Sequence, residues 1–302
     1  MSALNSPHPS GLAVEAAPGV DRDAAARAML ALLPALRPAQ GEAALSAALS
    51  GRGALSRWRR HRAAFVLDDA ELAAALRTQG GVHVKIYEPK DALETALGIA
   101  SRDRGATSFR MGVALRARGL PTPEPLLLLL RKPLRVHRET VLVTRGLEAP
   151  VLLTDELKRR LAAREPIRPL LDEAARLAAT LHHQGFFHGD FTASNLVLAG
   201  PAGARSLSLI DLDRARDLRR LPAVVARGIQ TLDLRMLLLT SWGEVSRREW
   251  LRLLARYARA RNLGRGAARR LARRVLSARR GRVRLGAKAP TLGGPAPWPD
   301  SR

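Results

Sequence analysis

The chain has 302 residues, 46% of them hydrophobic, and a formal net charge of +24. This length allows one large domain or two small ones, and the hydrophobic content excludes a wholly disordered chain. Because there is no cysteine, disulfides, thiolate zinc ligands and thiol catalysis are excluded. The N-terminal residues show no secretory signal. The longest aliphatic block, Leu126 to Leu130, is far shorter than the roughly 20 residues that span a bilayer. We expect a protein that is soluble or sits on a membrane surface.

The first half of the chain is predicted to combine short helices with β-strands. Residues 1–20, rich in Pro, Gly, Ala and Ser, are expected to form a loose tail. Helices are predicted over 21–36, 43–49 and 109–118, and strands over 63–67, 82–87, 126–130 and 140–144. In the strand 82–87, apolar and polar residues alternate, which places Lys85 on the polar face.

The second half is predicted to be mainly helical. A short hairpin is expected around the Gly/Pro/Ala turn 199–204, and residues 289–302 read as a second loose tail. Helices are predicted over 155–164, 167–183, 231–240, 246–260 and 267–279, and hairpin strands over 196–198 and 207–210. A β-rich first half followed by an α-rich second half predicts two lobes rather than one wound sheet.

Most of the positive charge lies near the C-terminus. Residues 214–302 hold 23 Lys or Arg against five Asp or Glu. Such a surface would suit a phosphorylated substrate, anionic lipid or nucleic acid, but arginines spread over solvated helix faces give the same pattern. Aromatic residues make up only 4% of the chain, so base-stacking platforms, and with them nucleic-acid binding, are not expected.

A polar loop after the helix 167–183 carries the most informative residues. It reads His188-Gly-Asp190-Phe-Thr-Ala-Ser-Asn195, and a later apolar strand ends in Asp211. Phosphoryl transfer needs a carboxylate to orient the attacking hydroxyl, and an amide oxygen and a second carboxylate to hold Mg²⁺. Asp and Asn also shape turns, but the three groups together, with Asn195 and Asp211 at one end of a predicted hairpin, favour phosphoryl transfer.

These residues resemble the motifs of the protein-kinase-like superfamily. His188-Gly-Asp190 stands where protein kinases have His-Arg-Asp, and Asn195 stands at the second-metal Asn. Asp211 matches the Asp of the Asp-Phe-Gly motif, and Lys85 in Val-His-Val-Lys-Ile-Tyr matches the strand lysine that contacts nucleotide phosphates. The resemblance implies an α+β, two-lobed protein-kinase-like fold with a small β-rich N-lobe and a larger α-helical C-lobe.

More narrowly, the chain resembles the lipopolysaccharide core kinases, the Kdo and heptose kinases, over about residues 60–262. The resemblance lies in segments 108–125, 181–190, 210–216, 233–238 and 250–257. It implies an N-lobe over 21–144, with an N-terminal helical extension, and a C-lobe over 145–288. It also implies ATP and Mg²⁺ as cofactors, Asp190 as the catalytic residue, Lys85 as a nucleotide-binding residue, and Asn195 and Asp211 as metal ligands.

Two features depart from the superfamily pattern. No glycine-rich phosphate loop is evident: Gly51-Arg-Gly53 is a weak candidate, and the loop could instead be built around the basic segment Ser56 to Arg60. The helix around 107–110 has no acid to pair with Lys85, and Glu94 and Asp103 are the nearest upstream candidates.

Three functional hypotheses follow. The first is a kinase that phosphorylates a sugar hydroxyl of a lipopolysaccharide core or similar glycolipid. It would lie in the cytoplasm or at the inner face of the cytoplasmic membrane, with its basic C-terminal helices facing anionic lipid. The second is a protein (Ser/Thr) kinase or an aminoglycoside-type small-molecule kinase. The third is a nucleotide-binding pseudokinase that acts as a scaffold, which the two departures favour.

Overall fold

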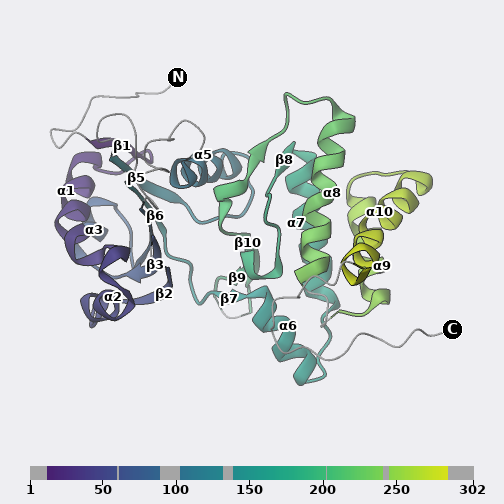
Figure 1. The fold of residues 1–302 in the computed structure, drawn as a ribbon, viewed down its shortest axis with the longest axis horizontal. Helices are drawn as coiled ribbons and strands as arrows, with labels where there is room; N and C mark the ends of the chain where they lie inside the picture. Colours follow the sequence, from purple (N-terminus) through teal and green to yellow (C-terminus); the bar gives the residue numbers. More distant parts are fainter. Residues whose placement is uncertain are drawn as a thin grey trace. The chain divides into compact units, whose positions relative to one another are not determined.

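The computed structural model describes residues 12–59, 61–88, 103–131, 139–201, 203–240 and 245–284 (Figure 1). The chain divides into two compact units, one made of Met1–Leu147 with Leu212–Arg214, the other of Glu148–Asp211 with Ala215–Arg302. Within the described residues, no helix has both the length and the apolar composition needed to cross a membrane.

The first unit is built on a six-stranded sheet with the order β1-β5-β6-β4-β3-β2, in which neighbouring strands run antiparallel. Its strands are β1 (Leu12–Ala16), β2 (Gly53–Arg59), β3 (Arg62–Leu67), β4 (Val82–Tyr87), β5 (Pro125–Arg131) and β6 (Glu139–Arg145). Its helices are α1 (Arg22–Leu32), α2 (Glu42–Leu49), α3 (Ala70–Ala75) and α5 (Arg104–Arg116), with single turns at Leu33–Leu36, Pro38–Gln40 and Leu212–Arg214.

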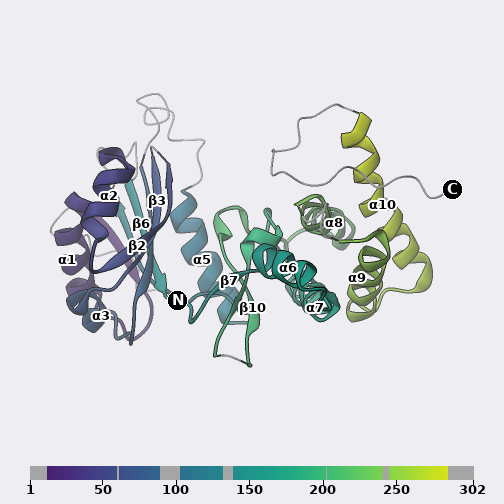
Figure 2. The same ribbon diagram turned by 90° about the horizontal axis from the view of Figure 1, so that it is seen from below.

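Both faces of this sheet are covered by helices (Figure 2). The main core lies between the sheet and α1 to α3, and it takes every second residue of the central strands, such as Phe65 and Val84. A smaller cluster on the opposite face includes Phe109 of α5 and Leu142 of β6. The two-residue period of a strand sends alternate side chains to these two cores, so Lys85 lies on the α5 side of the sheet.

The second unit is mainly helical. Its helices are α6 (Leu153–Ala162), α7 (Arg168–His183), α8 (Ala223–Thr240), α9 (Arg247–Ala260) and α10 (Arg265–Arg284). Its short strands are β7 (Val151–Leu152), β8 (Phe186–Phe187), β9 (Leu196–Ala199), β10 (Ser206–Leu209) and β11 (Arg216–Asp217), with a single helical turn at Ala193–Asn195. Helix α7 packs against α8 and α9, and α10 packs against α8 and α9. The hairpin β9–β10 forms where the sequence predicts one.

Several elements differ from the sequence-based expectation. Helix α3 and the short strands β7, β8 and β11 were not predicted, and α5 begins at Arg104 rather than at Phe109. Residues 12–16, expected within the tail 1–20, form β1, because they pair with β5 through the backbone. Strand β2 was not predicted, and α8 begins at Ala223 rather than at Thr231. Helix α10 begins at Arg265 and continues to Arg284, beyond the predicted end at Arg279. The expected tail 289–302 lies outside the described residues.

Candidate active site

Asp190 and Asn195 lie on one loop of the second unit and are joined by a hydrogen bond. Asn195 Nδ2 donates to the backbone carbonyl of Asp190 at 2.9 Å, and the backbone N–H of Thr192 donates to the same carbonyl at 2.8 Å. These bonds close the loop through main-chain atoms. Among the described residues, the Asp190 carboxylate has no hydrogen-bond or ion-pair partner, and it is partly exposed. It is therefore available to an external hydroxyl group.

The β9–β10 hairpin brings Asp211 next to this loop. Beyond the last β-ladder pair, Leu196 with Leu209, the N–H of Ile210 donates to the carbonyl of Asn195 at 3.0 Å. Asp211 follows directly and has a positive φ of 61°, a left-handed conformation in which Asp is tolerated better than most residues. The sequence prediction that the hairpin sets Asn195 and Asp211 at one end of paired strands agrees with this geometry.

His188 supports the loop. Its side chain is buried, and its Nε2 lies 3.0 Å from the carbonyl of Ile210. The N–H of Asp190 donates to His188 Nδ1 at 3.3 Å, and the ring meets Phe191 edge to face. With a proton on Nε2, this imidazole links the loop to the end of β10. These contacts make His188 a structural support of the loop.

Asp233 of α8 fixes the start of the loop. Its carboxylate is fully buried and accepts hydrogen bonds from the N–H groups of His188 and Gly189 at 2.8 and 2.9 Å. His182 Nε2 lies 3.1 Å from the same carboxylate. Three donors thus converge on one enclosed carboxylate, which ties α7, α8 and the loop together.

His182 and Tyr257 complete this network. Burial lowers the pKa of His182, despite the opposing effect of Asp233, so the ring is neutral near pH 7. Its Nε2–H then donates to Asp233, and Nδ1 accepts from the Tyr257 hydroxyl at 2.8 Å. Burial also raises the pKa of Tyr257 to about 12, which keeps the phenol protonated.

The network was not predicted from the sequence. His182 lies in the last turn of α7, and its side chain is buried against Asp233 and Tyr257. Asp233 and Tyr257 lie in segments that resemble the kinase family, but neither was assigned a role. The only signal was a single acid in the helix predicted over 231–240.

Lys85 belongs to the first unit, in the middle of β4. It lies directly opposite Ala64 of β3 and Leu142 of β6 and is partly buried. Of its two candidate partners, Glu94 lies outside the described residues. Asp103 caps α5, because its carboxylate accepts from the N–H of Ala106 at 3.0 Å and from the Thr140 hydroxyl at 3.1 Å.

The glycines proposed for a phosphate loop have structural explanations. Gly53 lies within β2, and a Cβ there would be 2.2 Å from the carbonyl oxygen of Val66, so only glycine fits. Gly51 has a φ of 75° in the turn that precedes β2. The alternative segment, Ser56 to Arg60, falls in β2 as far as Arg59, and Arg60 lies outside the described residues.

Asp213 belongs to the first unit and pairs with an arginine of the same unit. Its carboxylate lies 3.5 Å from Arg62 Nη1 of β3. The Arg62 guanidinium also lies over the ring of Tyr87, 4.9 Å from its centroid.

The donor set of Asn195 and Asp211 fits Mg²⁺. One amide oxygen and one carboxylate are hard oxygen ligands, and Mg²⁺ typically takes one or two protein carboxylates plus substrate phosphates and water. Among the described residues there is no group of three or more His, Cys, Asp and Glu side chains that could hold a metal ion. With Asn195 and Asp211 as its protein ligands, Mg²⁺ would also be held by nucleotide phosphates and water.

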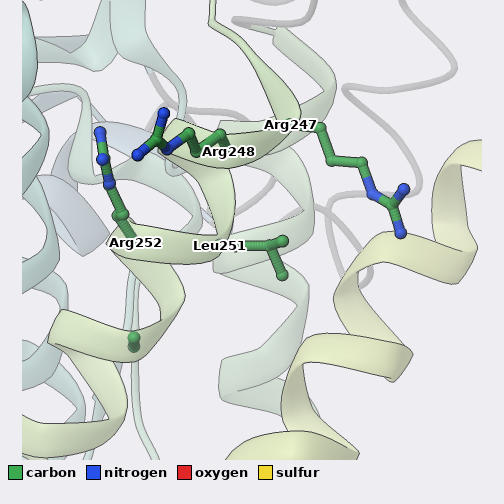
Figure 3. A pocket seen from close by; sticks show the side chains of 5 residues that line it. Arg247, Arg248, Leu251 and Arg252 are labelled. Carbon is green, nitrogen blue, oxygen red and sulfur yellow. The ribbon is translucent and has the colours of Figure 1, made fainter. Parts of the chain in front are cut away.

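A separate open groove of about 640 Å³ runs along α9 (Figure 3). It contains none of the predicted site residues and is lined by Arg247, Arg248, Leu251, Arg252 and Ala255.

On α10, Val275 is buried and Leu271 partly buried, while the paired arginines 269, 270, 273 and 274 are exposed. Over its described side chains, α10 is thus a packed helix with a basic outer face.

Comparison with known proteins first defines the fold class. A solved structure of WaaP in complex with acyl carrier protein matches this chain with a TM-score of 0.52 and 22% identity, covering 75% of this chain and 89% of that chain. The α+β protein-kinase-like fold predicted from the sequence is thus confirmed.

The family follows from the sequence. A model of the lipopolysaccharide kinase (Kdo/WaaP) family matches residues 60–257, well over half of the chain. The chain therefore belongs to the Kdo/WaaP family of lipopolysaccharide kinases, as its motifs suggested. It is also 33% identical over 170 residues to a 3-deoxy-D-manno-octulosonic acid kinase of Stenotrophomonas maltophilia, over 55% of this chain. That match spans 64% of the relative's own length.

Proposed function

We propose that this protein is a kinase that uses ATP and Mg²⁺ to phosphorylate a sugar hydroxyl of a lipopolysaccharide core or similar glycolipid. The observation that carries the proposal is the loop on which Asp190 keeps its carboxylate available while its main chain is bonded to Asn195. The family match and the name of the Stenotrophomonas relative, a kinase of a sugar acid, support this type of acceptor.

The roles of the side chains follow from their chemistry. Asp190 orients the acceptor hydroxyl and accepts its proton as the oxygen forms a bond to the γ-phosphorus and the bond to the ADP oxygen breaks. Asn195 and Asp211 would hold Mg²⁺, and Lys85 would contact the nucleotide phosphates. When bound, Mg²⁺ supplies positive charge that neutralises the phosphate oxygens. Asp233 and His188 keep Asp190 in place through the loop main chain.

We also propose that the enzyme works at the cytoplasmic face of a membrane with anionic lipids. The exposed arginines of α9 and α10 support this location, because each basic residue near an anionic surface contributes roughly 1 kcal/mol of attraction. Vesicle co-sedimentation should show binding to phosphatidylglycerol vesicles, weaker binding at high salt, and none to phosphatidylcholine vesicles. Equal binding to both vesicle types would argue against the proposal.

Substitution of Asp190 tests the catalytic assignment. Asp190→Ala should reduce phosphoryl transfer from labelled ATP by about 10²-fold or more, because the general base is lost, while calorimetric nucleotide binding stays within about twofold. Asp155→Ala, which removes an exposed acid of α6, serves as the control and should retain transfer. Retained transfer in Asp190→Ala would refute the assignment.

A panel of candidate acceptors tests which molecule receives the phosphate. Lipopolysaccharide core, a protein substrate and an aminoglycoside are each offered with labelled ATP. Label in the core glycolipid alone is the expected result. Label in protein or aminoglycoside would favour the second hypothesis of the sequence analysis, and nucleotide binding without any transfer would favour a pseudokinase.

A further inference from the structure

A row of three side chains crosses the first unit's sheet at Lys85. Arg57 of β2 lies directly opposite Ala64 of β3, and Ala64 lies directly opposite Lys85 of β4. Directly opposed residues of antiparallel strands project from the same face of a sheet. Arg57 and Lys85 therefore stand on one face, two strands apart, with only an alanine methyl group between them.

The burial pattern shows that this row lies on the face opposite the main core. The neighbouring row, Trp58, Ala63 and Ile86, belongs to the main core under α1 to α3. The row of Arg57 and Lys85 continues instead into Leu142 of β6, which packs in the cluster with α5. The cluster with α5 thus lies at the Leu142 end of this row, and Arg57 at the other end is exposed.

The spacing of the two cations suits a polyphosphate. Strands in a sheet are about 4.8 Å apart, so the Cα atoms of Arg57 and Lys85 are separated by about 10 Å. Both side chains are long enough to reach a group held above Ala64. Among the described residues, the Arg57 guanidinium has no hydrogen-bond or ion-pair partner. It is thus able to form charge-assisted hydrogen bonds to an anion.

The β2–β3 hairpin contains no glycine-rich phosphate loop. Glycine-rich loops bind phosphates with backbone N–H groups that glycine leaves accessible, but the sequence has no glycine between Ser56 and Leu67. The nearby Arg62 is already engaged with Asp213 and Tyr87. Of the arginines described in this hairpin, Arg57 is the one that shares the row of Lys85.

We propose that Arg57 and Lys85 form a two-cation clamp for the polyphosphate of the nucleotide, in which the Arg57 guanidinium replaces the backbone amides of a glycine-rich loop. This inference rests on the proposed function, since it names a further residue that binds the same nucleotide. It predicts that Arg57 recognises the phosphates and makes no contribution to binding of the nucleoside part.

Calorimetric binding of ATP, ADP and adenosine, with and without Mg²⁺, tests the clamp. Arg57→Gln should weaken ATP binding by about 10-fold or more, ADP binding less, and adenosine binding by less than twofold, as expected for a lost charge-assisted hydrogen bond. Arg57→Lys keeps the charge without the bidentate fork and should recover part of the loss. Arg27→Gln, an exposed arginine of α1, is the matched control and should bind all three ligands normally.

The possible outcomes separate the two proposals. Equal ATP binding by Arg57→Gln and Arg27→Gln, with transfer intact in the wild type, would overturn the clamp and leave the proposed function standing. Equal losses for ATP and adenosine, with an unchanged melting temperature, would also overturn it, because the phosphates would not be what Arg57 recognises. A wild-type protein that binds no ATP would overturn both.

Discussion

The two units position their functional side chains by different means. In the first unit, the backbone register of an antiparallel sheet sets Arg57 and Lys85 on one face. In the second unit, the loop of Asp190 depends on buried polar side chains, above all Asp233. A sheet distributes its stability over many main-chain bonds, whereas a polar network fails when one member is removed. The second unit should therefore be far more sensitive to single substitutions near its site.

The strongest test of this difference is the loss of Asp233. Asp233→Ala should cost about 3–5 kcal/mol of stability, because the N–H groups of His188 and Gly189 and the buried His182 lose their acceptor. Urea denaturation measures the effect, and transfer activity should fall with it. Asp217→Ala, at an exposed acid of the same unit, should cost less than 1 kcal/mol. A loss for Asp233→Ala as small as this would show that the loop holds its shape without the network.

An intermediate effect is expected from the titration of His182. Its pKa is lowered from 6.5 in the folded protein by burial, so below pH 6.5 the unfolded chain binds a proton that the folded protein excludes. Stability should therefore fall with decreasing pH below about 6.5, by at most about 1.4 kcal/mol per pH unit from this one group. Urea midpoints between pH 7.5 and 5 measure the slope.

Two variants isolate the contribution of His182 to that slope. His182→Gln should flatten the pH dependence, since glutamine does not titrate. His183→Gln, at the exposed neighbouring position, should keep it. If the wild type and His182→Gln show the same slope, then the proton exclusion inferred for the buried ring does not occur.

The smallest effect concerns the first unit. The ion pair of Arg62 and Asp213 is partly buried, with side-chain exposures of 22% and 5%. A double-mutant cycle with Arg62→Gln and Asp213→Asn should give a coupling energy of about 1 kcal/mol, within the range of ordinary ion pairs. A coupling above about 3 kcal/mol would mean that the first unit, too, relies on a single polar contact, and the contrast between the units would be lost.

Regular elements with strong periodicity were predictable from the sequence. The alternation of β4 and the helical spacing of α7 place both elements close to their observed bounds. The hairpin was predictable because a turn rich in glycine separates two apolar runs. It sets Asn195 beside the residue before Asp211, as the kinase motifs require.

Other elements depend on partners that are distant in the sequence. Strand β1 exists because its backbone pairs with β5, more than a hundred residues away, and its short sequence resembles a tail. Strand β2 is an edge strand with a mostly exposed, polar sequence and a register shift between Leu55 and Arg57, so it lacks a clear alternation. The row of Arg57 and Lys85 could be recognised only once β2 and its register with β3 were known.

The polar network of the second unit could not be predicted from the sequence for a similar reason. His182, Asp233 and Tyr257 come from α7, α8 and α9, and their mutual burial is a property of the helix packing. Residue type alone places histidine at a helix end and aspartate on a surface. Only the packed arrangement turns the three into one hydrogen-bonded unit.

The β9–β10 hairpin has a practical consequence. Its strands are paired from Leu196 with Leu209 to Ala199 with Ser206, so the catalytic end of the ladder is separated from the turn by the whole length of the strands. The turn residues Pro201 and Ala204 are exposed, and loop tips of this kind accept added residues well. A fluorescent label or a short affinity tag inserted there would report on the protein during catalysis while the reacting groups stay in place.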